Sequence, residues 1–230
     1  MTQTISILST KTLSDEQRQA FIDAKIDLLE QDFIEIENSN FELKNINENL
    51  IFSSQNAVLS LMEQPNWEKY KAKNVFCVGI KSKELLEKNG FKVDVYMDYA
   101  SELAEIITLI YNSDSFTFFS GNLRKETLPK ALKDSKIKFN EIETYKTKLA
   151  PFKISKEEKF DGILFFSPSG VESYLIDNKI KNETCFCIGE TTSEALENKK
   201  IKNIIVSQHP TIDNVVIDVL DHYNPESLQQ

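Results

Sequence analysis

The feature that most constrains this 230-residue chain is a repeat within its own sequence. The segment CVGIKSKELLEKNGFK begins at Cys77 and resembles CIGETTSEALENKKIK, which begins at Cys187, 110 positions later. Four further pairs of segments follow the same order at similar offsets; they begin at residues 5 and 116, 33 and 139, 51 and 165, and 93 and 203. Self-similarity of this kind indicates a duplicated structural unit. Chance likeness between short strands would explain one match but hardly five in order.

Within each repeat, apolar runs of strand length alternate with longer periodic segments, which predicts a parallel sheet with covering helices. The fold class we expect is therefore α/β, with two small parallel-sheet domains. Helical periodicity is clearest over residues 15–31, 100–111 and 211–223. Thr191-Thr192 and Lys81-Ser82 stand where helix N-caps belong. Asn89-Gly90 is placed to end a helix.

Charge and apolar patterning exclude several classes of protein. The net charge is −9 and the chain has only two arginines, Arg18 and Arg124, which argues against a nucleic-acid partner. No apolar run approaches the roughly 20 residues that cross a bilayer, and the first residues do not resemble a signal peptide. We therefore expect a cytoplasmic protein without a membrane partner.

Cysteine and histidine give no sign of a metal centre or a disulfide framework. The three cysteines are an odd count, and Cys185 and Cys187 would share one face of a strand, so buried thiols are the better interpretation. His209 and His222 have no ligand spacing, and we expect both at the surface.

Small and hydroxyl residues follow at least five of the predicted strands. In open parallel sheets, ligands bind beyond the carboxyl ends of the strands, where helix N-termini offer unpaired N–H groups. Taken singly, each junction reads as an ordinary cap or turn, but the repetition in both halves favours a binding site for a small anion or polycarboxylate. These junctions are Ser9-Thr10, Ser53-Ser54, Ser120-Gly121-Asn122, Ser167-Pro168-Ser169-Gly170 and the run from Gly189 to Thr192.

Sequence motifs for nucleotide binding and for a serine nucleophile are missing. No GxGxxG or Walker sequence occurs, and SPSG at residues 167–170 is not the GxSxG of serine hydrolases. No pair of carboxylates stands out among the 36 acidic residues.

An ordered set of segments resembles the uroporphyrinogen-III synthase family over nearly the whole chain. The most specific part is FFSPSGVESYL (165–175) followed by CIGETTSEAL (187–196). The other segments are FSSQNAV (52–58), CVG (77–79), SGNLRKETLPKAL (120–132), IETYKT (142–147) and HPTIDNVVIDVL (209–220).

The resemblance implies two interleaved α/β domains joined by two extended linkers, with the active site in the cleft between them. The first domain would comprise residues 1–34 and 152–230, and the second residues 38–148. The linkers would be residues 35–37 and 149–151. Periodicity alone would have indicated two tandem halves instead.

The implied reaction closes the linear tetrapyrrole hydroxymethylbilane to uroporphyrinogen III, with loss of water and inversion of the last pyrrole ring. No cofactor or metal is implied. Since the substrate ionises readily and also cyclises unaided without inversion, the enzyme would mainly supply proximity and orientation. The expected partner is this tetrapyrrole polycarboxylate, taken up by a monomer that could receive it from the preceding enzyme of the pathway.

The resemblance also assigns residue roles. Tyr145 matches a tyrosine proposed to assist the departing hydroxyl, although packing of the linker would equally explain it. One of Thr191 and Thr192 would face the substrate and the other would cap its helix. Lys11 replaces a more usual arginine, and Asn56 lies in a segment that departs from the family pattern. The full set of expected substrate-binding residues is Lys11, Ser53, Ser54, Asn56, Gly79, Gly121, Asn122, Arg124, Ser167, Ser169, Gly170, Gly189, Thr191 and Thr192.

Two other readings fit the same sequence. A non-enzymatic two-domain sensor that only detects a small anion would share the fold and the polar loops, and so would an inactive relative of the enzyme. The isomer formed from hydroxymethylbilane distinguishes them.

Overall fold

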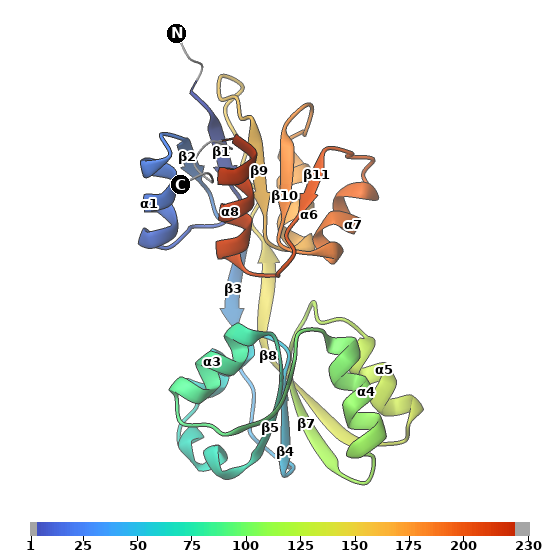
Figure 1. The fold of residues 1–230 in the computed structure, drawn as a ribbon. Helices are drawn as coiled ribbons and strands as arrows, with labels where there is room; N and C mark the ends of the chain where they lie inside the picture. The colour runs from blue at the N-terminus through green and yellow to red at the C-terminus, as the bar shows by residue number, and fades with distance from the viewer. Residues whose placement is uncertain (1–3, 224–230) are drawn as a thin grey trace. The chain divides into compact units, whose positions relative to one another are not determined.

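Two units, each with its own sheet of mainly parallel strands, make up the chain in a computed structural model that describes residues 4–223 (Figure 1). One unit contains the chain up to Glu35 together with the chain from Lys148 onward, and the other is the continuous segment Ile36–Thr147. The expected boundaries at 34/38 and 148/152 lie within four residues of these. The second expected linker, 149–151, begins inside a strand, because β8 runs without interruption from Lys138 to Leu149.

In the first unit, five parallel strands have the order β11-β10-β9-β1-β2. Helices α1 and α8 pack together, and so do α6 and α7; the two pairs cover opposite faces of the sheet in Figure 1. The strands are β1 (Ser6–Ser9), β2 (Asp27–Glu30), β9 (Gly162–Phe165), β10 (Thr184–Cys187) and β11 (Ile204–Val206). The helices are α1 (Asp15–Asp23), α6 (Pro168–Asp177), α7 (Glu190–Glu197) and α8 (Ile212–Tyr223).

The second unit contains a six-stranded sheet of order β3-β8-β7-β4-β5-β6, in which β4 to β8 are parallel. Its strands are β3 (Ile34–Asn38), β4 (Asn49–Phe52), β5 (Asn74–Val78), β6 (Val93–Met97), β7 (Ser115–Gly121) and β8. Its helices are α2 (Gln55–Met62), the 3-10 helix η1 (Trp67–Ala72), α3 (Ile80–Lys88), α4 (Ala100–Ile110) and α5 (Thr127–Asp134).

Burial on both faces of the sheets explains the unbroken apolar runs in the sequence. In β9, Leu164 belongs to the core beneath α1 and α8, whereas Ile163 and Phe165 belong to the core beneath α6 and α7. All three are completely buried. A strand covered on both sides has no solvent face, so its sequence does not alternate between polar and apolar residues.

The strand orders confirm the α/β class. They also show that the two units share one strand arrangement, as a duplication predicts. The order β8-β7-β4-β5-β6 in the second unit corresponds to β2-β1-β9-β10-β11 in the first. One repeated segment pair is wrong in register. Phe139 lies at the start of β8, where it pairs with Phe116, whereas Phe33 lies beyond the end of β2. Short alternating strands resemble one another at several offsets, so the sequence could not fix that match.

Helix boundaries were predicted with mixed success. The expected helices over 100–111 and 211–223 are confirmed by α4 and α8, and Asn89 ends α3 with Gly90 at φ +85°. The helix expected over 15–31 is wrong beyond Asp23. Lys25 adopts φ +58° and starts a turn, after which residues 27–30 form strand β2. The leucines there fit a helix period by coincidence.

The N-caps expected at Thr191-Thr192 and Lys81-Ser82 are also wrong. Both helices begin earlier, and their N-caps are Gly189 and Gly79. The carbonyl oxygen of each glycine accepts the amides of the third and fourth helical residues, and glycine offers no side-chain cap. Among residues 4–223, no helix has both the length and the apolar composition that a membrane span requires.

Candidate active site

The loops that follow the parallel strands of the first unit lie at one edge of its sheet. The chain runs outward from β1 to β2 in one direction and from β9 to β11 in the other, so β1 and β9 flank the point where the order reverses. Ligands bind at such points in open α/β sheets. The candidate site of this unit therefore centres on the loops after β1 and β9.

The loops after β1 and β9 are in direct contact. The amide and hydroxyl of Thr10 both donate to the carbonyl oxygen of Leu164, at 3.1 and 2.6 Å. A Cβ atom on Gly170 would lie 3.7 Å from Oγ1 of Thr10, in ordinary contact. Two segments that the sequence separates by more than 150 residues are therefore joined at the reversal point.

The serines after β9 are partly committed to the start of α6. Ser167 is the N-cap: its hydroxyl accepts the amide of Gly170 at 3.0 Å and lies 3.0 Å from the hydroxyl of Ser169. Pro168 stands at the first helical position, where its missing N–H costs nothing. Thus the amide of Gly170, which we had expected to meet the substrate, is already bonded, and the hydroxyl of Ser169 is the freer group.

In the loop after β10, no side chain caps helix α7, so the groups available to a ligand include the backbone of Gly189. Gly189 has an extended backbone (φ 177°), and a Cβ there would meet only Pro210, at 3.9 Å. Thr192 is 1% exposed, whereas Thr191 is half-buried and has no hydrogen bond from its hydroxyl within residues 4–223. Of the two threonines, Thr191 is therefore the one placed to face a ligand.

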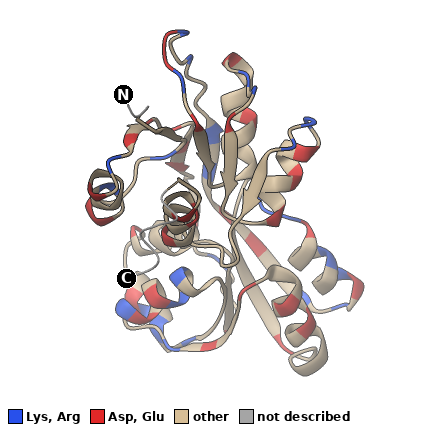
Figure 2. Cartoon of the chain, turned by 45° about the horizontal axis from the view of Figure 1, so that its top comes forward, with Lys and Arg blue, Asp and Glu red and all other residues tan. Residues whose placement is uncertain are grey.

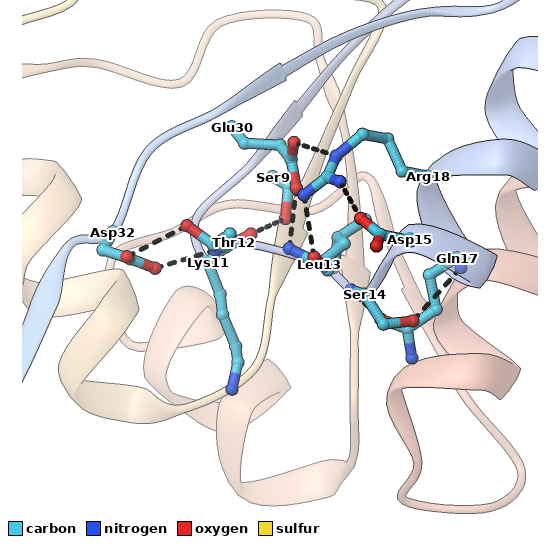
Figure 3. A network of polar contacts seen from close by, with 10 residues as sticks. All are labelled: Ser9, Lys11, Thr12, Leu13, Ser14, Asp15, Gln17, Arg18, Glu30 and Asp32. Atoms are coloured by element: carbon cyan, nitrogen blue, oxygen red, sulfur yellow. Dashed lines mark hydrogen bonds and ion pairs between the residues drawn. The ribbon is translucent and has the colours of Figure 1, made fainter.

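Lys11 follows β1 and is exposed. Its carbonyl oxygen accepts the hydroxyl of Ser9 at 2.5 Å, but its ammonium has no ion pair in the part of the chain that the structure describes. Figure 3 shows its side chain leaving the polar network around it.

In the second unit, the order reverses between β4 and β7, and β4 is followed by Ser53-Ser54. Ser54 caps α2, and its hydroxyl accepts the amide of Asn56 at 3.1 Å. The hydroxyl of Ser53 and the side-chain amide of Asn56 have no hydrogen bond within the described residues, and both residues are half-buried. The two adjacent serines thus differ in role.

Gly79 follows β5 in a left-handed conformation, with φ +84°, that residues with a side chain adopt at a cost. Its amide donates to the carbonyl oxygen of Met97 at 2.9 Å, and a Cβ there would meet no atom within 4 Å. The backbone of Gly79 therefore borders open space at this edge of the sheet.

Tyr145 lies on β8 beside the end of β7, paired with Gly121. A Cβ on Gly121 would lie 2.4 Å from Cζ of Tyr145, so the ring occupies the space that a side chain at position 121 would need. Tyr145 is half-buried, and its hydroxyl has no partner within the described residues. Asn122 joins the same two strands: its side chain accepts the amide of Thr147 at 2.8 Å and donates to the carbonyl of that residue at 3.2 Å.

Arg124 is fully engaged with protein carboxylates. Its Nε and Nη2 donate to the two oxygens of Glu141 at 2.5 and 3.0 Å, and Nη1 donates to Glu126. Burial disfavours the ionised form of Glu141, but the hydrogen bonds from Arg124 and Ser120 outweigh it, so the pKa of this carboxyl lies below its ordinary value. Glu141, which no sequence signal singled out among 36 acidic residues, therefore occupies the guanidinium of Arg124, a residue that we had expected to bind the substrate.

The structure places the cysteines in the core and the histidines at the surface, where the sequence led us to expect them. All three thiols are free and buried, with Cys185 and Cys187 in one core cluster, while His209 and His222 are exposed. No group of three or more metal-ligating side chains comes together within residues 4–223. Basic and acidic residues are interspersed along the helices and loops of both units (Figure 2).

The fold and these edges define a class of protein: α/β proteins of two duplicated parallel sheets, with hydroxyl- and amide-rich loops where the strands end. The chain belongs to the uroporphyrinogen-III synthase family, because a family model described as "Uroporphyrinogen-III synthase HemD" matches residues 18–217.

Individual relatives agree with this assignment. The chain is 27% identical to the uroporphyrinogen-III synthase of Saccharomyces cerevisiae, over 84% of this chain and 82% of that protein. The fold is similar to that of uroporphyrinogen-III synthetase from Helicobacter pylori, with a TM-score of 0.73 and 20% identity over 95% of this chain and 100% of the other. A mutant uroporphyrinogen III synthase from Thermus thermophilus matches with a TM-score of 0.68 and 13% identity, over 97% and 100% of the two chains. None of these relatives is described as a sensor, so that alternative finds no support.

Proposed function

We propose that this chain catalyses the closure of hydroxymethylbilane to uroporphyrinogen III. The hydroxymethyl carbon loses its hydroxyl group, the last pyrrole ring is inverted, and a new carbon–carbon bond closes the macrocycle, with one water released in total. The observation that carries the proposal is family membership across residues 18–217, which include every candidate site residue except Lys11.

Breaking the bond to the hydroxyl group needs little help from the enzyme, and controlling the geometry of ring closure is its main task. The pyrrole nitrogen assists departure of the hydroxide, and the remaining task is to hold a flexible chain so that the inverted product forms faster than the direct one. Loops rich in hydroxyls and amides suit this task, because they can bind acetate and propionate groups without strong nucleophiles nearby.

The free donors at the strand ends are the groups that support carboxylate binding. We assign this role first to the ammonium of Lys11, the hydroxyls of Ser53 and Thr191 and the backbone amide of Gly189, since these have no partner within the described residues. The hydroxyl of Ser169, whose one contact is the hydroxyl of Ser167, comes next, whereas the amide and carbonyl of Gly79 are already bonded and would hold their loop in place. Ser54, Ser167, Thr192, Gly170, Asn122 and Arg124 would act by holding their loops in place, because their polar groups or their burial already serve the fold. Asn56, half-buried beside Ser54, remains a candidate for a direct contact.

Tyr145 is the residue that we propose assists the leaving group. Its hydroxyl lacks a protein partner within the described residues, and its ring is held against Gly121. A phenol in this state can donate a hydrogen bond to a departing oxygen. We further propose a monomeric enzyme, which sedimentation of the purified chain would check.

The test supplies enzymatically generated hydroxymethylbilane to the purified chain and separates the product isomers. Formation of the type III isomer in excess over the spontaneous type I isomer is expected. A chain that leaves type I dominant would be a binding protein or an inactive relative, and the proposal would be overturned.

Tyr145→Phe tests the leaving-group role separately. We expect kcat to fall about tenfold, less than the roughly hundredfold or more typical of general acids, because the pyrrole already assists ionisation. Tyr111→Phe is the matched control: Tyr111 precedes β7 at the opposite edge of the same sheet and packs against Phe76. A Tyr145→Phe variant as fast as the control would remove the role from Tyr145 but leave the overall reaction intact.

A further inference from the structure

The loop between β1 and α1 is held by two carboxylates from the end of β2 (Figure 3). Asp32 accepts both the amide and the hydroxyl of Thr12, at 2.7 and 3.0 Å. Glu30 accepts the amide of Leu13 at 2.6 Å through one oxygen and Nε of Arg18 at 2.8 Å through the other. Bonds to ionised acceptors of this kind are the strong ones among protein hydrogen bonds.

These contacts fix the peptide group that follows Lys11 at both of its polar atoms. The carbonyl oxygen of Lys11 accepts the hydroxyl of Ser9, which is buried, and the amide on the other side of the same peptide group donates to Asp32. The residue before Lys11 is fixed as well, since Thr10 donates twice to Leu164. The backbone of Lys11 is therefore immobilised, whereas its side chain is exposed and has no partner within residues 4–223.

The charges in this network are distributed so that the ammonium of Lys11 stays free. Glu30 is neutralised by Arg18, which also donates to Asp15 and to the carbonyl of Leu13. Both carboxylate oxygens of Asp32 accept hydrogen bonds from Thr12, and neither pairs with a cation in the part of the chain that the structure describes. Both oxygens of Asp32 and both oxygens of Glu30 therefore already accept hydrogen bonds, and the ammonium of Lys11 forms no ion pair with either carboxylate within residues 4–223.

Lys11 is also the only lysine or arginine in the five loops that follow the strands of the first unit, over residues 10–14, 31–33, 166–167, 188–189 and 207–211. Both arginines of the chain are paired internally, Arg18 with Glu30 and Arg124 with Glu141. A polycarboxylate at this edge would therefore meet a single full positive charge.

We propose that Asp32 is a positioning residue that acts through Lys11: it fixes the peptide after Lys11 so that the ammonium meets one carboxylate of the tetrapyrrole. This inference rests on the proposed function. Since the contact is made to a peripheral carboxylate and not to the reacting carbon, its loss should raise KM and change kcat little.

A double-mutant cycle tests the proposal in the intact protein, with hydroxymethylbilane as substrate. Lys11→Ala and Asp32→Ala are each expected to raise KM about tenfold, the size of one lost contact to a charged group. In the Lys11→Ala background, Asp32→Ala should raise KM less than about twofold further, because the residue through which it acts is gone. Asp32→Asn keeps an acceptor for the amide of Thr12, so its KM should stay close to that of the wild type.

Asp23→Ala is the matched control, since Asp23 is an exposed carboxylate at the end of α1 that accepts only the side chain of Gln19. If Asp32→Ala raises KM equally with and without Lys11, or if it lowers only the amount of folded protein, Asp32 is merely structural and the proposal fails. Should Asp32→Ala not fold, Thr12→Val, which removes one of the two bonds, takes its place in the cycle. A wild-type chain that makes no type III isomer overturns the proposed function itself, whereas additive effects in an active enzyme overturn this inference alone.

Discussion

The ring of Tyr145 lies where the side chain of residue 121 would be: a Cβ atom on Gly121 would come within 2.4 Å of Cζ, 2.6 Å of Cε2 and 2.8 Å of Cε1. Real Cβ atoms do not approach other atoms so closely, so either residue must move if Gly121 is replaced. Gly121, which we had expected to bind the substrate, instead leaves room for the ring of Tyr145.

Gly121→Ala should therefore displace the phenol. We expect kcat to fall by up to about tenfold, the loss expected when the hydroxyl is removed in Tyr145→Phe, with a loss of about 1–3 kcal/mol in the free energy of unfolding from overpacking. Steady-state kinetics and thermal unfolding measure the two effects. Gly189→Ala is the control for stability, because its backbone suits any residue and the nearest atom to its Cβ is 3.9 Å away. A Gly121→Ala enzyme with unchanged kcat would show that the position of the ring does not matter.

The adjacent residues Ser53 and Ser54 have different roles: Ser54 caps helix α2, and Ser53 is a proposed substrate contact. Ser54→Ala removes the N-cap of α2 and should cost about 1 kcal/mol of stability. Ser53→Ala removes a hydroxyl without a protein partner within the described residues, so its unfolding free energy should change by less than about 0.5 kcal/mol while KM rises. Equal destabilisation by both substitutions would contradict this division.

The ion pair of Arg124 and Glu141 predicts a pH dependence with a definite sign. Because the folded pKa of Glu141 lies below the ordinary value of 4.5, the pair stabilises the protein above that pH, and the contribution is lost as the pH falls through the folded pKa. Glu141→Gln should unfold at a lower temperature than the wild type at neutral pH, and the difference should shrink in acid.

Glu143→Gln, on the same strand, is the control for that measurement. Glu143 forms only an exposed ion pair with Lys146, 4.0 Å away, and such pairs contribute little. A difference between Glu141→Gln and the wild type that stays constant with pH would mean that Glu141 acts through packing instead of charge.

The three thiols should be inert in the folded protein. Burial raises the pKa of Cys77, Cys185 and Cys187 to about 12, so the reactive thiolate is scarce at roughly pH 8. A thiol reagent should titrate none of them in buffer and all of them in denaturant. Fast modification of the native protein would show that a strand of the core opens readily.

Local patterns in the sequence predicted most of the strands and the polar loops that follow them. They did not predict the interleaving of the two units, which only the family resemblance implied, or the residue pairs that hold the loops. The repeat with Cys77 and Cys187 placed β5 and β10 at equivalent positions, and the sheet orders confirm that. The helix expected over 15–31 was wrong because Lys25 adopts a left-handed turn that no local residue signals. Partners such as Glu141 for Arg124, or Tyr145 for Gly121, come from neighbouring strands, and only the strand register brings them together.

The interruption of the first unit by the second has a consequence for synthesis on the ribosome. Strands β1 and β2 emerge early, yet β9, which must pair with β1, follows only after residues 31–161 have been made. The inserted unit is contiguous and can mature as soon as it leaves the exit tunnel, as domains generally do. The part translated first is thus completed last, and its exposed β1 edge must be kept from wrong partners during that delay.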